Sequence, residues 1–279
     1  MTRKKPDWLK IKLPKGENYH FVSDIVHKHH LHTICESGKC PNIGECWGNR
    51  TATFMILGDI CTRSCKFCNT KTGKPLPPDA AEPVKLARAI KLMELKHAVI
   101  TSVDRDDLPD KGASHWAACL NEIHEQIPDI TMETLIPDFN GKHELLDKII
   151  AAKPDIVSHN VETVERLTPR VRSHAKYKTS MDVIQYLSEQ GMRSKSGIMI
   201  GLGETDEEIY KTMDDLLDAG CEILTIGQYL QPTAKHLPVD RYVTPDAFDE
   251  IKQTGLDKGF TFVECSPLVR SSYHADQQV

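Results

Sequence analysis

The sequence predicts an α/β protein built around a parallel β-sheet, and two features of its pattern predict it. From about Thr51 onward, short apolar runs alternate with amphipathic stretches roughly six times along the 279-residue chain. The apolar runs are nearly continuous, which is typical of parallel strands covered on both faces. Periodicity alone leaves open a closed or partial (β/α) barrel and an open doubly wound sheet.

Each expected strand is a short apolar run, and the runs lie at 52–57, 98–103, 131–136, 155–161, 197–201, 222–227 and 260–263. Between the strands, apolar residues at helical spacing predict amphipathic helices at 86–93 and 209–217. Thr205 and Glu208 form a capping-box pattern at the start of the second helix. The first 50 residues lack the alternation, which predicts an extension laid against the sheet.

A glycine-rich stretch at 197–203, GIMIGLG, is the candidate phosphate-binding loop. It lacks the G-x-G-x-x-G order of a dinucleotide-binding fold and the lysine of a P-loop. We therefore expect a strand-to-helix turn that uses glycine for its backbone freedom.

Charge and hydropathy exclude several classes of protein. Lys and Arg total 35 against 40 Asp and Glu, a net charge of -5, whereas binding driven by phosphate neutralisation needs a basic surface. The mean hydropathy is -0.40, and no apolar run approaches the roughly 18 residues of a membrane span. The first residues, MTRKKPDWLKIKLPKG, lack the apolar region of a secretory signal. We expect a cytoplasmic protein with neither a nucleic-acid nor a membrane partner.

Nine cysteines are unusual in an otherwise ordinary chain. Without an export signal the protein is expected in a reducing compartment, where disulfides are rare. Six of the nine lie between Cys35 and Cys68, and thiolates crowd together in this way when a soft metal holds them. The other three are scattered and are expected to be small buried hydrophobes: Cys119, Cys221 and Cys265.

One triplet, Cys61, Cys65 and Cys68, has C-x3-C-x2-C spacing directly after the first expected strand. The loop beyond the C-terminal end of a parallel strand is where such folds bind ligands. Three thiolates can hold three corners of a four-iron cluster and leave the fourth iron open to a substrate or cofactor. The alternative is a zinc site, but zinc prefers four ligands and paired C-x2-C units.

A second triplet lies upstream in CESGKCPNIGEC, where Cys35, Cys40 and Cys46 have C-x4-C-x5-C spacing. It again offers three thiolates and no obvious fourth ligand. The alternative interpretation is a set of unrelated structural cysteines on a loop. Two incomplete triplets in one chain indicate two clusters with different roles.

The C-x3-C-x2-C spacing, with the aromatic Phe67 before its last cysteine, resembles the signature of radical S-adenosylmethionine (radical SAM) enzymes. In that superfamily the open iron chelates the amino and carboxylate groups of the methionine. An electron from the cluster then splits the sulfonium, and the 5′-deoxyadenosyl radical abstracts hydrogen from an unactivated carbon. The resemblance implies a partial (β/α)6-type barrel at 51–265, an N-terminal extension at 1–50 carrying the second triplet, and a C-terminal tail at 266–279.

Across almost the whole chain the resemblance narrows to the lipoyl synthase family. The stretches that carry it include PDWLKIKLP, CESGKCPNIGECW, TATFMILGDICTRSCKFC, TSVDRDDLPDKGA, METLIPDF, NVETVERLTPRVR, GLGETDEE, TIGQYLQPT, HLPVDRYVTP and PLVRSSYHAD. It implies insertion of two sulfur atoms, at C6 and C8 of an octanoyl chain on a lysine of a carrier protein, giving lipoyl-protein. Because those C–H bonds are unactivated, a carbon radical is the workable route, and a cofactor carries such chemistry.

The same resemblance implies which residues hold each cluster. Cys61, Cys65 and Cys68 hold the radical-generating 4Fe-4S cluster. The second triplet holds an auxiliary 4Fe-4S cluster that donates the sulfur and is consumed. Its fourth ligand is a serine of the RSSY motif, Ser272, with Ser271 as the alternative. The implied partners are an octanoylated lipoyl domain of a 2-oxoacid dehydrogenase E2 subunit or a glycine-cleavage H protein, and an electron donor such as ferredoxin or flavodoxin.

Polar residues at strand ends are the candidates for binding S-adenosylmethionine. They are Thr101, Ser102 and Asp104 after the second strand, Asn160 and Glu162 after the fourth strand, and Arg172. The resemblance implies that the first group binds the methionine amine. The second group is expected to bind ribose or methionine polar groups, and the arginine a carboxylate.

Two further regions are expected to contact ligands. Gln228 and Leu230 sit at a late strand end and are expected near the adenine. A basic surface for the carrier protein is expected around Arg170, Arg172, Lys176 and Lys178.

Three other classes of protein remain as alternatives. Another radical SAM sulfur-inserting enzyme, acting on RNA, fits poorly because the chain lacks a basic binding module. A non-catalytic two-cluster electron carrier is usually shorter and fully ligated by cysteine. A zinc-stabilised binding protein is the third.

Overall fold

The computed structural model describes residues 5–11, 15–172 and 174–278. Residues 12–14 of the PDWLKIKLP stretch lie outside this part, as do residues 1–4, 173 and 279. Within the described ranges, no helix is long and apolar enough to cross a bilayer.

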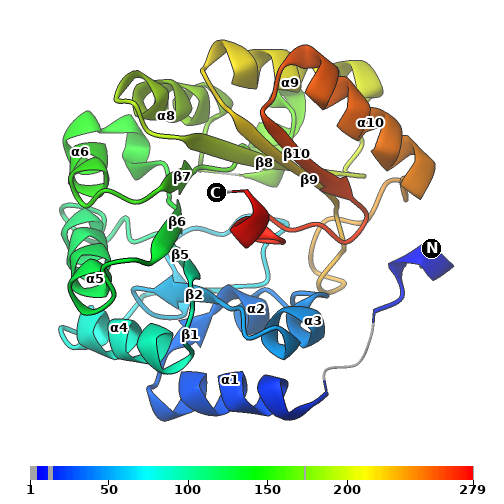
Figure 1. Cartoon of the computed structure of the whole chain (residues 1–279). Helices are drawn as coiled ribbons and strands as arrows, with labels where there is room; N and C mark the ends of the chain where they lie inside the picture. Colours follow the sequence, from blue (N-terminus) through cyan, green and yellow to red (C-terminus); the bar gives the residue numbers. More distant parts are fainter. Residues whose placement is uncertain (1–4, 12–14, 173, 279) are drawn as a thin grey trace.

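One sheet organises the chain, and its strand order is β1-β2-β5-β6-β7-β8-β9-β10. Pairing is parallel from β2 to β10, and β1 is an antiparallel strand at one edge. The strands span His32–Thr33 (β1), Thr53–Ile56 (β2), His97–Ser102 (β5), Thr131–Leu135 (β6), Ile156–Ser158 (β7), Ser194–Ile200 (β8), Ile223–Gln228 (β9) and Phe262–Ser266 (β10). The sheet curls round into a barrel (Figure 1). Its two edge strands, β1 and β10, do not pair with each other in the part of the chain that is described, so the barrel is partial. The predicted fold class is confirmed.

Helices cover the outer face of the barrel, between successive parallel strands (Figure 1). They span Glu82–Leu92 (α4), Ala113–Gln126 (α5), His143–Ala151 (α6), Tyr177–Glu189 (α8), Asp206–Asp218 (α9) and Pro245–Lys258 (α10). The capping box predicted from Thr205 and Glu208 is present at the start of α9. Because each helix returns the chain to the same end of the sheet, the C-terminal ends of all the parallel strands meet at one face.

The N-terminal segment packs on the barrel. It contains η1 (Asp7–Leu9), α1 (Glu17–Lys28), β1, α2 (Ile34–Ser37) and α3 (Ile43–Gly48). Val22, Val26 and Trp47 are fully buried, and they belong to the same hydrophobic cluster as strands β2, β5 and β6. The segment that carries the second triplet therefore shares its core with the first half of the barrel.

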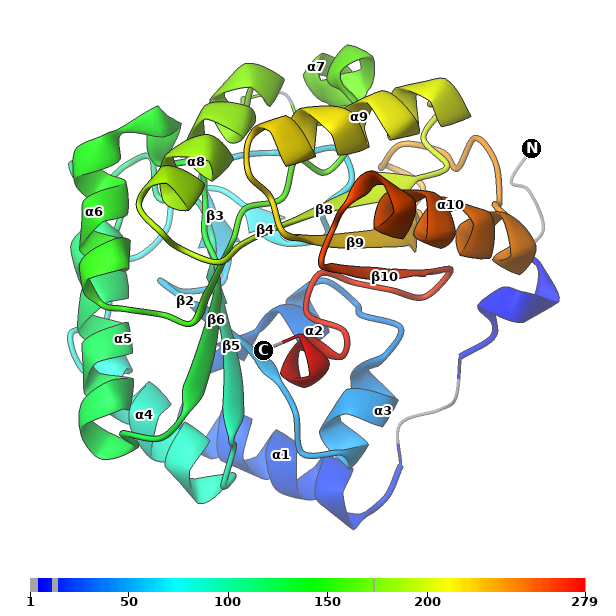
Figure 2. The ribbon, with the colours of Figure 1, turned by 45° about the horizontal axis from the view of Figure 1, so that its top comes forward.

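The C-terminal tail turns into the barrel, and in Figures 1 and 2 its end lies inside the ring of strands. It finishes with the short helix η4 (Ala275–Gln277). Asn42, before α3, donates to the Leu268 carbonyl at 2.8 Å, and the Tyr273 hydroxyl donates to Glu45 at 3.0 Å. These bonds bring the N-terminal and C-terminal segments together.

The hydrophobic core continues from the sheet to the surrounding helices. A second cluster joins β8, β9 and β10 to α8, α9 and α10. The three scattered cysteines are buried in these clusters, as predicted, with exposed fractions of 0%, 2% and 3% for Cys119, Cys221 and Cys265.

β7 is shorter than predicted, because the chain bulges away from β8 after Ser158. It rejoins β8 where Glu162 bridges to Ile198. Between these points β7 advances four residues while β8 advances three, as in a β-bulge. Glu162 adopts φ 67, a left-handed conformation that is uncommon outside glycine. The bulge changes the direction in which the side chains after β7 point.

The GIMIGLG stretch divides between strand and turn. Gly197 lies within β8, whereas Gly201 and Gly203 have φ values of 97 and 108 in the connection to α9. The predicted glycine-dependent turn is therefore confirmed for the last two glycines, and the first one has a different use in the site.

Candidate active site

A cavity of about 500 Å³ opens inside the barrel at the C-terminal ends of the strands. Both cysteine triplets, the β5 and β7 ends and the C-terminal tail contribute to its wall. The sequence-predicted residues that line it are Cys35, Cys40, Cys61, Cys65, Cys68, Thr101, Ser102, Asp104, Asn160, Glu162, Arg172 and Ser272. Cys46 lies behind them, where burial and then the charges of Cys40 and Cys35 raise the pKa of its thiol to about 12.

The first triplet lies on the loop that follows β2, starting in the short strand β3 (Ile60–Cys61). Burial, with a contribution from the charge of Asp104, raises the pKa of Cys61 to about 11 and of Cys65 to about 12. The backbone N–H groups of Arg63 and Asp104 each donate to the Cys61 sulfur at 3.4 Å. A metal that displaces the thiol proton would leave a thiolate that these N–H groups stabilise.

Backbone contacts anchor this loop to the barrel wall. The Lys66 N–H donates to the Val171 carbonyl at 2.9 Å, and the His236 imidazole donates to the Cys68 carbonyl at 2.9 Å. Phe67 packs against a small hydrophobic cluster that includes Val171. The aromatic residue of the motif is therefore partly buried against this cluster, and like the three cysteines it also lines the cavity.

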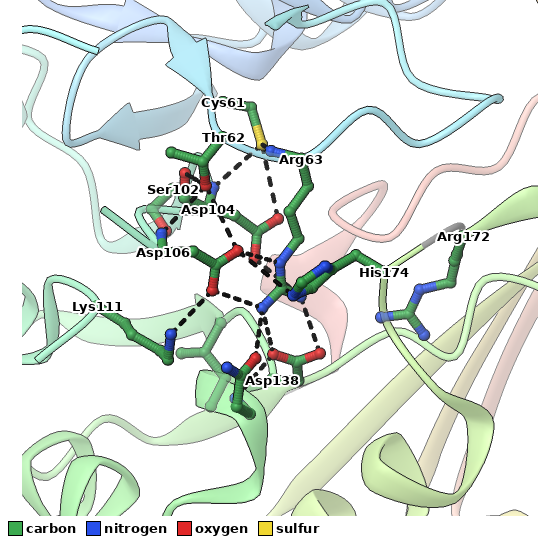
Figure 3. Close-up of polar contacts among 12 residues, drawn as sticks. Cys61, Thr62, Arg63, Ser102, Asp104, Asp106, Lys111, Asp138, Arg172 and His174 are labelled. Carbon is green, nitrogen blue, oxygen red and sulfur yellow. Dashed lines mark hydrogen bonds and ion pairs between the residues drawn. The ribbon is translucent and has the colours of Figure 1, made fainter. Parts of the chain in front are cut away.

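Arg63, between the first two cysteines of the loop, binds three carboxylates (Figure 3). Its guanidinium donates to Asp106 at 2.6 and 3.0 Å and to Asp138 at 2.9 and 2.8 Å. It also lies 3.3 Å from Asp104, and its side chain is only 4% exposed. Burial would raise the pKa of Asp138, but Arg63 outweighs it and lowers that pKa to about 2. These ion pairs connect the loop that carries the first triplet to the ends of β5 and β6. Removing one partner would leave a buried charge unpaired, which costs about 3–5 kcal/mol of stability.

The second triplet lies on α2, α3 and the turn between them. Burial and then the charge of Cys40 raise the pKa of Cys35 to about 11, while N–H groups of Thr53 and Trp47 lower it. Trp47 is fully buried, and its indole nitrogen has no hydrogen-bond partner among the described residues. An unpaired indole N–H near a cysteine sulfur suits a ligated thiolate, whose charge it would stabilise.

The RSSY motif reaches the second triplet. The Thr53 hydroxyl donates to the Ser272 oxygen at 2.7 Å, and both Ser271 and Ser272 line the cavity. The charge of Arg270 lowers the pKa of Cys40, although burial raises it more strongly. The tail thus places a serine hydroxyl and a cation at the second triplet.

A direct bond joins the two cysteine loops. Asn69, next to Cys68, donates its side-chain N–H to the Ser37 carbonyl at 2.9 Å. Ser37 lies between Cys35 and Cys40 in the second triplet. Because a carbonyl only accepts, the bond needs the amide of Asn69 and would be lost with a carboxylate at this position.

Neither triplet is spaced for a single zinc ion. Among the described residues, a group with three potential ligand atoms within 4.8 Å of one another forms at Glu82, His115 and Cys119, and neither triplet forms such a group. Tetrahedral zinc holds its sulfurs only about 3.8 Å apart, given a Zn–S distance of about 2.3 Å. The wider spacing and the all-thiolate donor sets fit a multi-iron cluster.

Three predicted cofactor residues lie at the C-terminal end of β5: Thr101 and Ser102 are its last two residues, and Asp104 follows it. The Thr101 hydroxyl donates to a backbone carbonyl of β6, and the Ser102 oxygen accepts from a tryptophan of α5, so both are tied to the fold. Burial raises the pKa of Asp104, with Arg63 opposing it. The Asp104 carboxylate also accepts from the Cys61 thiol at 3.6 Å, which places this residue at the first triplet.

The β7 bulge carries Asn160 and Glu162 to the cavity. The Asn160 amide donates to Glu162 at 3.2 Å, but its oxygen is buried and accepts no hydrogen bond from the described residues. A Cβ atom at Gly197 would lie 2.9 Å from this oxygen, so glycine permits the close approach. Burial raises the pKa of Glu162. An unpaired acceptor beside a carboxylate suits a ligand ammonium or hydroxyl group.

A chain of hydrogen bonds positions Arg172. One guanidinium nitrogen donates to Ser180 at 2.9 Å and to the Val161 carbonyl at 3.2 Å. His159 must donate from Nδ1 to the Ile136 carbonyl at 2.9 Å, so its Nε2 accepts from the Ser180 hydroxyl, also at 2.9 Å. The other two guanidinium nitrogens form no hydrogen bond within the described ranges and leave Arg172 able to bind a carboxylate.

His159 should make the stability of the protein depend on pH between 5 and 7. Burial and then the charge of Arg172 lower the pKa of His159 to about 4, whereas an unfolded histidine titrates near 6.5. The unfolded state therefore binds more protons in this window, and about 2 kcal/mol of stability is lost as the pH falls from about 7 to about 5. In His159→Asn, the difference between the free energies of unfolding at the two pH values, measured with urea, should shrink by that amount. An unchanged difference would contradict the assignment.

Two expectations from the sequence are wrong. Gln228 does not line the cavity, because its buried amide donates to three backbone carbonyls and accepts one backbone N–H, whereas Leu230 does line it. Arg172 is only 7% exposed and therefore does not belong to a partner surface. The other three residues of that surface are exposed: Arg170, Lys176 and Lys178.

Several residues of the site are absent from the sequence prediction: Arg63, Thr53, Asp138, His159 and Ser180. Two of them carried a signal, because Arg63 is a charged residue inside the first cysteine loop and Asp138 lies three residues after the end of β6. The others carried none, since their partners lie in different elements of the fold.

Comparison with known proteins decides between the classes of enzyme. Residues 55–216 match the Radical SAM superfamily. The lipoyl synthase of Bacteroides fragilis (strain YCH46) is 61% identical over 276 residues, which cover 99% of this chain and 96% of that protein. This chain belongs to the lipoyl synthase family. The lipoyl synthase of Treponema denticola is 56% identical over 278 residues, which cover 100% of this chain and 96% of that protein.

Two solved structures share the fold of this lipoyl synthase family member. SuiB of Streptococcus suis, bound to its precursor peptide SuiA, superposes with a TM-score of 0.61 at 12% identity, covering 88% of this chain and 52% of that chain. Methylornithine synthase (PylB) superposes with a TM-score of 0.57 at 12% identity, covering 87% and 81%. Membership of the superfamily implies a 4Fe-4S cluster and S-adenosylmethionine, and the chain is a radical SAM enzyme.

Proposed function

We propose that this enzyme inserts two sulfur atoms, at C6 and C8 of an octanoyl chain on a carrier protein, to give lipoyl-protein. The observation that carries the proposal is that the first triplet and two cysteines of the second, Cys35 and Cys40, open onto one cavity. Two sites on one cavity can act on the same bound chain without its release. Identity with lipoyl synthases over nearly the full chain supports the choice of reaction.

The first triplet would hold the cluster that binds S-adenosylmethionine, since Cys61, Cys65 and Cys68 lie at the strand ends beside the candidate cofactor residues. When bound, the cluster and cofactor supply a radical able to abstract hydrogen from an unactivated carbon. Arg172 would bind the methionine carboxylate, because two of its nitrogens lack partners among the described residues. The Asn160 oxygen and Glu162 would accept from the ammonium or a ribose hydroxyl.

The second triplet would hold an auxiliary 4Fe-4S cluster that serves as the sulfur donor, with Ser272 as its fourth ligand. The bond between Thr53 and Ser272 supports this choice over Ser271, because it fixes the Ser272 oxygen beside Cys35. An oxygen ligand is harder than a thiolate and matches iron less well, so it suits a cluster that is dismantled during the reaction.

The partners follow from the reaction. The substrate would be an octanoylated lipoyl domain of a 2-oxoacid dehydrogenase E2 subunit or a glycine-cleavage H protein, and a ferredoxin or flavodoxin would supply electrons. The exposed cations Arg170, Lys176 and Lys178 offer a contact surface for an acidic carrier.

Iron content and product mass test the proposal together. Protein reconstituted anaerobically should hold roughly eight irons per chain and convert an octanoylated H protein to the lipoylated form when given S-adenosylmethionine and a reductant. About four irons per chain, with cofactor cleavage but no sulfur insertion, would instead favour a one-cluster radical SAM enzyme of another kind.

A further inference from the structure

A single hydrogen bond links the first strand of the barrel to the oxygen at the second triplet. The Thr53 hydroxyl donates to the Ser272 oxygen at 2.7 Å, across 219 residues of sequence. Thr53 is the first residue of β2 and is 5% exposed. Its backbone N–H also acts to lower the pKa of the Cys35 thiol, so Thr53 is linked to two of the four proposed ligands of this site.

We infer that Thr53 is a positioning residue that holds the Ser272 oxygen in the place where it completes the second cluster site. The inference rests on the proposed function, because it takes Ser272 to be a ligand. Its support is geometric: the χ1 angle of a serine has about three staggered positions, and a hydrogen bond to a strand residue selects one of them.

The direction of the bond is compatible with ligation. Ser272 accepts from Thr53, so the bond persists when Ser272 loses its own proton to bind a metal. A bond to an ionised oxygen is shorter and about twice as strong as one between neutral groups. If Ser272 donated instead, rotation of the two hydroxyl groups would make Thr53 the donor when Ser272 loses its proton, so the contact persists in either case.

Thr53 is a rigid support for this purpose. Its β-branched side chain has restricted rotamers, and its strand pairs in register with β5 at Val99. The tail around Ser272 is held by other bonds, from Asn42 to the Leu268 carbonyl and from Tyr273 to Glu45. Removing the Thr53 hydroxyl should therefore release the Ser272 oxygen without releasing the tail.

Thr53→Val tests the inference, because valine keeps the shape and loses the donor. In anaerobically reconstituted full-length protein, a chelator should remove the auxiliary iron about 10-fold faster from Thr53→Val than from wild type. Thr53→Ser retains the hydroxyl and should restore the wild-type rate, whereas Thr53→Ala should resemble Thr53→Val. Cleavage of S-adenosylmethionine and the melting temperature should stay close to wild type, which separates positioning from loss of folding.

A Ser272→Ala variant, measured in parallel, separates the role of Thr53 from the role of Ser272 as a ligand. Rapid iron loss in Ser272→Ala with a wild-type rate in Thr53→Val would overturn the role of Thr53 and leave the proposed function in place. Wild-type rates in both would overturn Ser272 as a ligand as well. Rapid loss in Thr53→Val that Thr53→Ser does not restore would also overturn the inference, because the hydroxyl would then not be the cause.

Discussion

Replacing Cys65 by alanine should abolish reductive cleavage of S-adenosylmethionine, whereas replacing Cys35 should leave that cleavage in place. Cys65 lies at the strand ends with Arg63, Asp104 and Arg172, the groups that shape the cofactor site. Cys35 lies on α2, beside the C-terminal tail and apart from those groups. Each variant should hold roughly four irons per chain instead of eight, because each loses one cluster.

The two variants should agree in sulfur insertion and differ in cleavage of S-adenosylmethionine. Neither should insert sulfur into an octanoylated carrier, since the reaction needs both sites. The measurement is 5′-deoxyadenosine by chromatography beside product mass, and Cys119→Ala is the matched control because Cys119 is buried in the core away from the cavity. Loss of 5′-deoxyadenosine in Cys35→Ala would contradict the division of roles between the triplets.

Gly227→Ala should empty the second site while sparing the first. Gly227 lies in β9, and an added Cβ would overlap the carbonyl oxygen of Val269 in the tail. The backbone of a strand cannot yield easily, so the tail must move, and Ser272 moves with it three residues later. Overpacking of this kind costs about 1–3 kcal/mol, which is enough to detach a tail.

Three measurements check Gly227→Ala. The iron content should fall to roughly four irons per chain, and proteolysis of the tail should become faster. Cleavage of S-adenosylmethionine should persist. Gly48→Ala is the matched control, because a Cβ at the end of α3 meets no atom within 4 Å. A Gly227→Ala protein that keeps all its iron and a protected tail would show that the tail does not hold the second site.

The apolar runs were sufficient to place the strands of the barrel, because both faces of a parallel strand are buried and its residues carry that burial in their composition. They were not sufficient for β7, whose apolar run continues past Ser158 although the strand ends there. The bulge depends on contacts with β8 and on the left-handed backbone conformation of Glu162, and neither feature changes the pattern of apolar residues in the sequence.

The cysteine triplets could be recognised as candidate ligands because metal chemistry restricts the spacing of ligands along a chain. The groups that support them could not, because they act across the barrel. Arg63 meets Asp138 75 residues away, and Thr53 meets Ser272 219 residues away. Gln228 shows the opposite error, since its place at a strand end favoured a ligand contact and the structure uses its amide to bind four backbone groups.

The meeting of the two chain ends has a consequence for biosynthesis. Cys35, Cys40 and Cys46 leave the ribosome early, but Ser272 and the tail bonds to Asn42 and Glu45 arrive only after the barrel strands have been made. A polypeptide cut short before residue 266 would retain the cofactor-binding loop and lack a finished second site. Under the proposed function, the order of synthesis therefore makes the second site the last part of the enzyme to be completed.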